Sequence, residues 1–284
     1  LAFLLLVLLF KSLAPTLHEH RELRFLLTPT NFIQATVGYL RNRWAIPVVV
    51  APLGRDAVKG TAWAGHHRKT LTVIVVGETA RAANFSLNGY SRDTNPLLAR
   101  QSALINFSRV SSCGTATAVS VPCVFSVLSR NDYTQSKGAS QEGLLDVLSH
   151  AGFAVLWRDN NSGCKGVCDR VGYEDLSRPD GKSPYCGGDE CYVERLLDGL
   201  PDLFKKSSKD LVVILHQKGS HGPAYASRYP RGFGRFGPVC TGNDFEKCSR
   251  ESIQAAYDNT ILYTDYFLNK TIEALRAMAD GQDA

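Results

Sequence analysis

The fold of this chain is decided by the stretch LTVIVV (residues 71–76), which the polar sequence GETAR (77–81) follows at once. A short, nearly continuous apolar run rich in Val and Ile is typical of a parallel strand that is buried on both faces. Two further runs of this kind are FAVLW (153–157) and LVVIL (211–215). We therefore expect three buried strands in the core of the molecule.

Helical patterns alternate with these strands. They cover Gln141–His150, Cys191–Lys206 and Glu251–Met278, and the last carries apolar residues at helical spacing. Strand–helix alternation is typical of an α/β fold, here a doubly wound, mostly parallel sheet flanked by helices. At 284 residues, 44% of them hydrophobic, the chain is long enough to bury one sizeable core.

The charge distribution argues against a nucleic-acid partner. The net charge is +5 and the isoelectric point is near 8.7, but the Lys and Arg residues are dispersed. A nucleic-acid-binding chain more often shows a basic stripe with interleaved aromatic residues. An ordinary solvated surface is the simplest interpretation, and attraction to an anionic membrane surface stays open.

The chain begins with ten apolar residues, LAFLLLVLLF (1–10), before Lys11. This run is about half as long as a membrane span. It lacks the basic start and the small-residue cleavage site of a signal peptide. We expect residues 1–12 to be the end of a transmembrane helix, so that the chain would begin inside a longer protein.

Residues 13–69 are predicted to bridge this helix to the main domain, which we expect at 70–284. Leu23, Leu26 and Leu27 share one face of a first short helical pattern, and Ile33, Val37 and Leu40 share one face of a second, which follows Pro29. Both patterns suit amphipathic helices at the membrane surface, although simple packing helices fit equally well. Residues 51–69 are rich in Gly, Ala and charge, and we expect a linker there. His66 and His67 in that linker are expected to be solvated rather than metal ligands.

The eight cysteines fall into four close pairs. An even number of cysteines in local pairs is typical of short-loop disulfides, and therefore of an oxidising compartment. The alternative is zinc bound through thiolates, for which only Cys164 and Cys168 have a suitable spacing. The predicted disulfides are Cys113–Cys123, Cys164–Cys168, Cys186–Cys191 and Cys240–Cys248.

Polar residues follow each predicted strand. Glu78 follows the first, Asn161 lies in the polar run after the second, and His216 and His221 follow the third. Because open α/β sheets bind ligands at the carboxyl ends of their strands, we expect these side chains to converge on one edge. Glu78 is well placed for a cation. The equal alternative is an acid in the first turn of the next helix.

A second group of candidates lies in the stretch SSCGTATAVSVPC (111–123), where small hydroxyl residues cluster inside a predicted disulfide loop. A turn of this kind that leads into a helix would present backbone N–H groups and a hydroxyl to an anion. A Thr or Ser there would act as a covalent nucleophile if a metal or a base lowered its pKa. A stapled turn without chemistry is the alternative.

Six blocks of sequence, taken in their order along the chain, together resemble those of a known family. They are VVGETAR (75–81), NGYSRDT (88–94), SSCGTATAVSVPC (111–123), WRDNNS (157–162), HQKGSHGPAY (216–225) and AYDN (256–259). Together they resemble the phosphoethanolamine–lipid A transferases, which include the mobile colistin-resistance enzymes and belong to the alkaline phosphatase and sulfatase superfamily. The resemblance covers about residues 71–270 and implies an alkaline phosphatase/sulfatase-like fold.

The resemblance implies a zinc-dependent enzyme of the bacterial inner membrane with its catalytic domain in the periplasm. Its donor would be phosphatidylethanolamine and its acceptor a lipid A phosphate, with a covalent phosphothreonine-type intermediate. Adding a cationic amine would lower the negative charge of the outer leaflet, and would thereby confer resistance to cationic peptides such as polymyxin.

The resemblance also implies the roles of individual residues. Thr117 would be the nucleophile and, together with Glu78, a zinc ligand. The residues expected to bind substrate are Thr115, Asn161, Lys165 and His221. His221 would lie where the phosphate group or a second zinc ion is held.

The chain departs from the family pattern in one respect, since no Asp-His-Gly-Glu stretch follows the last helical pattern. We therefore expect the 284 residues to be a piece truncated at both ends, inactive by itself and a poor zinc binder, because a catalytic zinc normally has three protein ligands. Alternatives are a phosphoglycerol transferase or a sulfatase-like hydrolase of the same superfamily. A catalytically silent, disulfide-stapled binding domain is a further alternative, which the zinc content of the full-length protein would separate from an enzyme.

Overall fold

The structure is a computed structural model that describes residues 30–43, 49–63, 68–187, 190–242 and 244–280. The chain divides into two units, 1–49 and 50–284. The described part of the first unit is the helix α3 (Thr30–Arg43), which confirms the helical pattern predicted after Pro29. Ile33 and Val37, on its predicted apolar face, are both 58% exposed.

The predicted end of a transmembrane helix, residues 1–12, and the first short helical pattern lie outside the described residues. Among the residues that the structure does describe, no helix is both long and apolar enough to cross a membrane.

The second unit is built on a four-stranded parallel sheet with the order β1-β6-β2-β3. Its strands are β1 (Leu71–Val76), β6 (Leu211–His216), β2 (Ala154–Asp159) and β3 (Gly172–Asp175). His216 lies opposite Val76 on one side and opposite Asp159 on the other, so three strands end at the same level. This common end places the polar residues that follow them on one edge.

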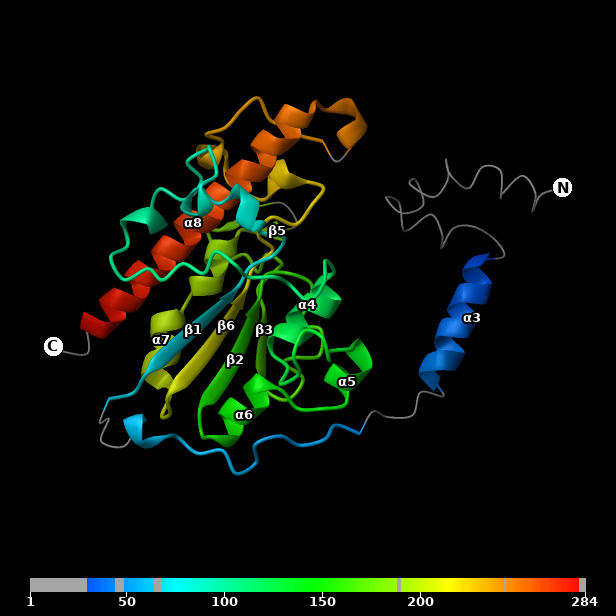
Figure 1. Cartoon of the computed structure of the whole chain (residues 1–284), viewed down its shortest axis with the longest axis vertical. Helices are drawn as coiled ribbons and strands as arrows, with labels where there is room; N and C mark the ends of the chain where they lie inside the picture. The colour runs from blue at the N-terminus through cyan, green and yellow to red at the C-terminus, as the bar shows by residue number, and fades with distance from the viewer. Residues whose placement is uncertain (1–29, 44–48, 64–67, 188–189, 243, 281–284) are drawn as a thin grey trace. The chain divides into compact units, whose positions relative to one another are not determined.

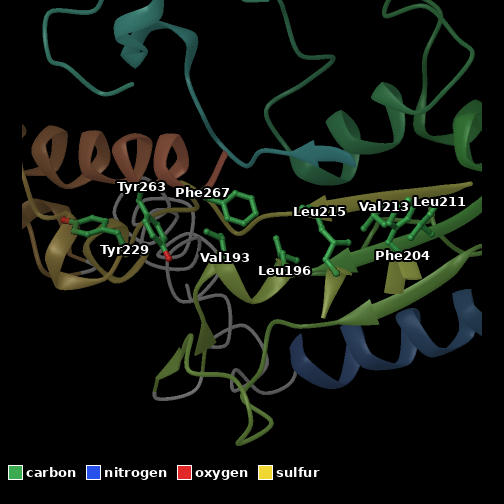
Figure 2. Close-up of a cluster of buried hydrophobic side chains, with 10 residues drawn as sticks. Val193, Leu196, Phe204, Leu211, Val213, Leu215, Tyr229, Tyr263 and Phe267 are labelled. Carbon is green, nitrogen blue, oxygen red and sulfur yellow. The ribbon is translucent and has the colours of Figure 1, made fainter. Parts of the chain in front are cut away.

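Helices cover both faces of this sheet, which confirms the predicted doubly wound α/β fold (Figure 1). On one face, alternate residues of β6 pack against α7 (Leu200–Lys206) and α8 (Arg250–Asp280) (Figure 2). On the other face, Val212 and Ile214 of β6 pack against residues of α4 (Thr117–Val124) and α6 (Leu144–His150). The strand alternation thus divides the buried residues into two clusters.

Several element boundaries differ from the sequence-based expectations. The helix expected over 191–206 is instead a 3-10 helix, η5 (Val193–Leu197), followed by α7, because Gly199 between them has a left-handed φ of +67°. The helix expected from Gln141 begins only at Leu144, where the Asp146 side chain accepts a hydrogen bond from the Gly143 backbone N–H. β2 and β6 extend to Asp159 and His216, beyond the apolar runs.

Some elements had no clear signal in the sequence. β3 and the two-stranded hairpin of β4 (Cys186–Gly187) and β5 (Glu190–Cys191) are among them, as is the short helix α5 (Gln135–Ala139). The remaining 3-10 helices are η1 (Thr61–Trp63), η2 (Ala82–Asn84), η3 (Ser86–Asn88), η4 (Leu98–Arg100), η6 (Tyr225–Ser227), η7 (Arg231–Phe233) and η8 (Phe245–Lys247).

The segment predicted as a linker packs, in its described part, against the α/β unit. The Leu53 backbone N–H donates to Glu142 Oε2 over 2.9 Å, and Lys59 forms an ion pair with Asp210. The Trp63 ring meets Phe153 edge-on at a centroid distance of 5.3 Å. Residues 50–63 therefore belong to the second unit, while His66 and His67 lie outside the described residues.

All four predicted disulfides are present with the predicted pairing. They are Cys113–Cys123, Cys164–Cys168, Cys186–Cys191 and Cys240–Cys248. The described part of the chain contains no free cysteine, so the thiolate zinc site considered as the alternative is not formed there.

Candidate active site

Glu78 lies two residues beyond the end of β1, and its side chain is almost fully buried. Its two carboxylate oxygens are held by two threonines: Oε2 accepts from Thr117 Oγ1 over 2.8 Å, and Oε1 accepts from Thr79 Oγ1 over 2.6 Å. The next helical turn, η2, begins only at Ala82. Glu78 therefore points into a hydrogen-bond network instead of capping a helix, which was the alternative interpretation.

Thr79 adopts a left-handed backbone conformation with φ of +51°. This conformation is unfavourable for a residue with a branched Cβ. It persists only where contacts with the surrounding structure stabilise it. Tyr257 of α8 supplies such contacts, because its hydroxyl donates to the Thr79 carbonyl over 2.6 Å and accepts from the Arg81 N–H over 2.8 Å. Tyr257 thus holds in place the turn that carries Glu78.

Thr117 is the first residue of α4, inside the loop that the Cys113–Cys123 disulfide closes. The sequence predicted a turn that leads into a helix here, and the structure confirms it. The positive end of the helix dipole lies at this position and favours a nearby anion. A half-buried hydroxyl that donates to a carboxylate is oriented with its oxygen lone pairs free for attack.

Asn161 connects the loop after β2 to Glu78. Its Nδ2 donates to Glu78 Oε2 over 3.2 Å and to the Gln217 carbonyl over 3.0 Å. The same nitrogen lies 3.3 Å from His216 Nε2. Glu78, Thr117 and Asn161, predicted from three separate stretches of sequence, therefore meet at the carboxyl end of the sheet.

A buried pair of charged or polar groups lies beneath this network. His216 Nδ1 is 2.8 Å from Asp159 Oδ2, and both side chains are at most 1% exposed. Burial alone would raise the pKa of the Asp159 carboxyl, but hydrogen bonds from His216 and Trp157 outweigh it and hold that pKa below its usual value. An ionised carboxylate only accepts hydrogen bonds, so His216 donates to Asp159 through Nδ1–H and turns Nε2 toward Asn161.

Asp159 also holds the loop that carries Asn161. Its Oδ1 accepts from the Asn161 N–H over 2.8 Å and from the Gly163 N–H over 3.1 Å. In the sequence, Asp159 and His216 are recognisable only as polar residues near strand ends. Their pairing follows from the parallel register, in which they are the last residues of adjacent strands.

The other predicted site residues lie outside this network. Thr115 is exposed, and no hydrogen bond joins it to Glu78, Thr117 or Asn161. Lys165 has a left-handed φ of +56°, and its Nζ donates to Ser162 Oγ over 2.8 Å within the same loop. His221 is exposed, with Nδ1 2.8 Å from the Gly222 carbonyl.

The described residues supply only part of a zinc site. Glu78 and Thr117 bring two oxygens together, whereas a catalytic zinc ion normally has three protein ligands. Nowhere in the described ranges do three or more His, Cys, Asp or Glu residues form a group that could hold a metal ion. The donor set does not complete the predicted site, and zinc binding stays a prediction.

Comparisons with known proteins agree with this fold. The profile described as Sulfatase matches residues 70–283, and the profile described as Phosphoethanolamine transferase EptA/EptB matches residues 1–44. The chain belongs to the sulfatase family. Several proteins similar to the chain are named phosphoethanolamine or phosphatidylethanolamine transferases.

Three of these relatives show the extent of the similarity. Phosphoethanolamine transferase EptA of Escherichia coli K12 is 41% identical over 283 residues, which are 99% of this chain and 51% of the relative. Phosphatidylethanolamine transferase Mcr-1 of Escherichia coli is 43% identical over 240 residues, 81% of this chain and 43% of the relative. The solved structure of the integral membrane lipooligosaccharide phosphoethanolamine transferase A (EptA) from Neisseria meningitidis is 40% identical, with a TM-score of 0.76 over 96% of this chain and 51% of that chain. The chain therefore spans about half the length of the curated relatives that it matches.

Proposed function

We propose that the protein containing this chain transfers phosphoethanolamine from phosphatidylethanolamine to a lipid A phosphate. The observation that carries the proposal is the Thr117 hydroxyl at the head of α4, which donates to the Glu78 carboxylate at the end of β1. The relatives named above are phosphoethanolamine transferases, and they support the same reaction class.

The proposed reaction has two steps. In the first, Thr117 Oγ1 forms a bond to the phosphorus of phosphatidylethanolamine, and the bond between phosphorus and the diacylglycerol oxygen breaks. Glu78 Oε2, 2.8 Å from Oγ1, is placed to receive the hydroxyl proton and to pass it to the diacylglycerol oxygen as that group leaves. In the second, an oxygen of a lipid A phosphate monoanion attacks the phosphorus of the phosphothreonine, and the bond from phosphorus to Thr117 Oγ1 breaks. The proton of the lipid A phosphate passes through Glu78 to Thr117 Oγ1.

The surrounding residues would hold the phosphoethanolamine group. The Lys165 ammonium is a cation on the loop that carries Asn161, and a phosphate oxygen would replace Ser162 as its acceptor. Thr115 and His221 are exposed and thus accessible to a substrate. Asn161 already bridges Glu78 and the end of β6, so its substrate contact would come through the amide oxygen.

Zinc is part of this proposal, with Glu78 and Thr117 as two of its ligands. A bound zinc ion would polarise the phosphoryl oxygens and favour the ionised form of the nucleophile. Because the described donor set is incomplete, the remaining ligands would have to come from outside the described residues.

We also propose that the protein resides at the bacterial inner membrane with its catalytic domain in the periplasm. Four disulfides in one domain are typical of an oxidising compartment. The EptA relative of known structure is an integral membrane protein by its description. Transfer to lipid A would lower the negative charge of the outer leaflet and would thereby give resistance to polymyxin-like cationic peptides.

The match to the sulfatase family favours one alternative, a hydrolase in which water replaces the lipid acceptor. A phosphoglycerol transferase would differ in its donor, and a catalytically silent chain would do neither reaction. The deciding experiment incubates the protein with phosphatidylethanolamine and examines the Thr117 peptide by mass spectrometry. Phosphoethanolamine on Thr117 that passes to lipid A supports the proposal. Release of free phosphoethanolamine without transfer supports the hydrolase. An unmodified peptide supports either a silent chain or a transferase that uses another donor, and repeating the experiment with phosphatidylglycerol separates these two.

A further inference from the structure

A cavity of about 560 Å³ lies directly beside the candidate active site. We call it the arginine pocket, and the lining residues that matter here are Thr79, Arg81, Tyr90, Tyr225, Arg250 and Tyr257. Thr79 forms part of its wall and also donates to Glu78 Oε1. The pocket and the nucleophile network thus share one residue.

The pocket is lined by two arginines, Arg81 and Arg250. Arg81 follows β1, and Arg250 is the first residue of α8; both are exposed. Within the described ranges neither forms a salt bridge, whereas Arg92 pairs with Asp258 and Arg228 pairs with Glu190. The positive end of the 31-residue helix α8 adds to the potential at the same place. This wall of the pocket therefore attracts an anion.

The aromatic part of the pocket lining comes from three tyrosines, Tyr90, Tyr225 and Tyr257. The Tyr225 and Tyr257 rings meet edge-on at 5.3 Å, and Tyr225 stacks on Phe245 at 5.7 Å, so their positions are fixed. Burial raises the pKa of Tyr257 to about 12, so its hydroxyl stays neutral and continues to hold the Thr79 and Arg81 backbone. Aromatic rings with polar tips offer flat apolar faces and hydrogen-bonding edges, which suit a sugar ring.

We propose that the arginine pocket binds a phosphorylated sugar of the acceptor, with Arg81 and Arg250 holding its phosphate. The inference rests on the proposed function for the identity of the acceptor. The donor does not fit, because its phosphate must lie at Thr117 and its amine is a cation that two guanidinium groups repel. An acceptor that carries phosphates on a sugar supplies both the anion and the ring.

The first test measures binding and does not depend on activity. The full chain is titrated calorimetrically with glucosamine 1-phosphate, inorganic phosphate and N-acetylglucosamine. We expect the sugar phosphate to bind more tightly than either other probe. Arg81→Ala and Arg250→Ala should each weaken it about tenfold, the lower end for charge-assisted hydrogen bonds because both side chains are exposed.

The matched control is Arg100→Ala, since Arg100 is an exposed arginine of η4 outside the pocket lining. It should bind the sugar phosphate like the parent chain. Equal binding of inorganic phosphate would overturn the sugar part of the proposal. Absence of binding, or the same loss in the control, would overturn the site itself. Both pocket variants keep their backbone contacts, and circular dichroism checks that they fold.

The second test separates this inference from the proposed function. In the active protein, the first-turnover release of diacylglycerol without acceptor reports the donor step, and transfer to labelled lipid A reports the acceptor step. We expect Arg81→Ala to slow the acceptor step about tenfold and to leave this first-turnover release of diacylglycerol unchanged. Equal slowing of both steps would assign the pocket to the donor and overturn the inference. If the parent protein released no diacylglycerol, the proposed function would fail while the binding result still decided the site.

Discussion

Replacement of Asp159 by Asn is the most direct test of the buried pair beneath the site. The substitution keeps the size of the side chain but removes its charge and turns one acceptor oxygen into a donor. That oxygen faces either the N–H groups of Asn161 and Gly163 or the N–H groups of His216 and Trp157. Two donors would then face each other without water, in a site that is 1% exposed.

We expect Asp159→Asn to lower the free energy of unfolding by about 3 kcal/mol, the scale for loss of a buried, hydrogen-bonded charge. For a unit of this size the melting temperature should fall by about 6–12 °C. The loop that carries Asn161 would also lose its anchor, so phosphoethanolamine transfer should slow. Calorimetric or circular-dichroism melts and the two-step assay measure these effects.

The pH dependence of this difference has a definite sign. The pKa of Asp159 is lowered in the folded protein, so its contribution to stability is present above the unfolded-state value of about 4. It is lost as the pH falls through the lowered folded-state pKa. The stability gap between the parent and Asp159→Asn should therefore be full at pH 7 and shrink below about pH 4.

The matched control is Asp175→Asn, since Asp175 lies opposite Asp159 in the sheet register but is exposed. It should change the free energy of unfolding by no more than about 0.5 kcal/mol. Equal stability of Asp159→Asn and the parent protein, or an equal loss in both variants, would refute the role assigned to the pair.

Three further predictions concern the site and the disulfides. Thr117→Ala should abolish phosphothreonine formation while the fold stays intact by circular dichroism, and Thr117→Ser should retain part of the reaction; full transfer by the Ala variant would identify another nucleophile. The isolated 284-residue chain should hold less than stoichiometric zinc after mild chelation, measured by atomic absorption, and tightly held stoichiometric zinc would show that the ligands have been misassigned. Mass mapping of non-reduced peptides should find the four sequential disulfides, and a free thiol or a crossed pair, for example between Cys186 and Cys248, would contradict the structure.

The sheet could be predicted from the sequence because its strands are unusually apolar. LTVIVV and LVVIL are buried on both faces by two layers of helices, so selection for burial leaves a continuous pattern in them. β3 carries only Gly172–Asp175, with mostly exposed side chains at the sheet edge, and therefore gives no such pattern. The break at Gly199 was missed because helical spacing continues through it, whereas the left-handed φ is set by the local turn.

The candidate site was predicted in part for a similar reason. Glu78 and Asn161 stand beside recognisable strand ends, and parallel strands bring such positions to one edge. The Asp159–His216 pair required the strand order, because β6 lies between β1 and β2 although it comes last in the chain. Its two members are 57 residues apart, and only the register shows that they face each other.

The arrangement of the strands also explains why the site is sensitive to register. Only β6 lies between β1, which leads to Glu78, and β2, which leads to Asn161, so the Asn161 amide reaches the Glu78 carboxylate across the end of β6. The same amide nitrogen donates to the carbonyl of Gln217, the residue directly after β6. A slip of β6 by one residue would turn His216 to the opposite face and remove the partner of Asp159. The packing of β6 between two layers prevents this slip, because Val213 and Ile214 would each turn away from the cluster in which they are now buried and face the other one. The alternation of β6 side chains between the two clusters therefore also fixes the strand register, and with it the positions of Glu78 and Asn161 beside Thr117.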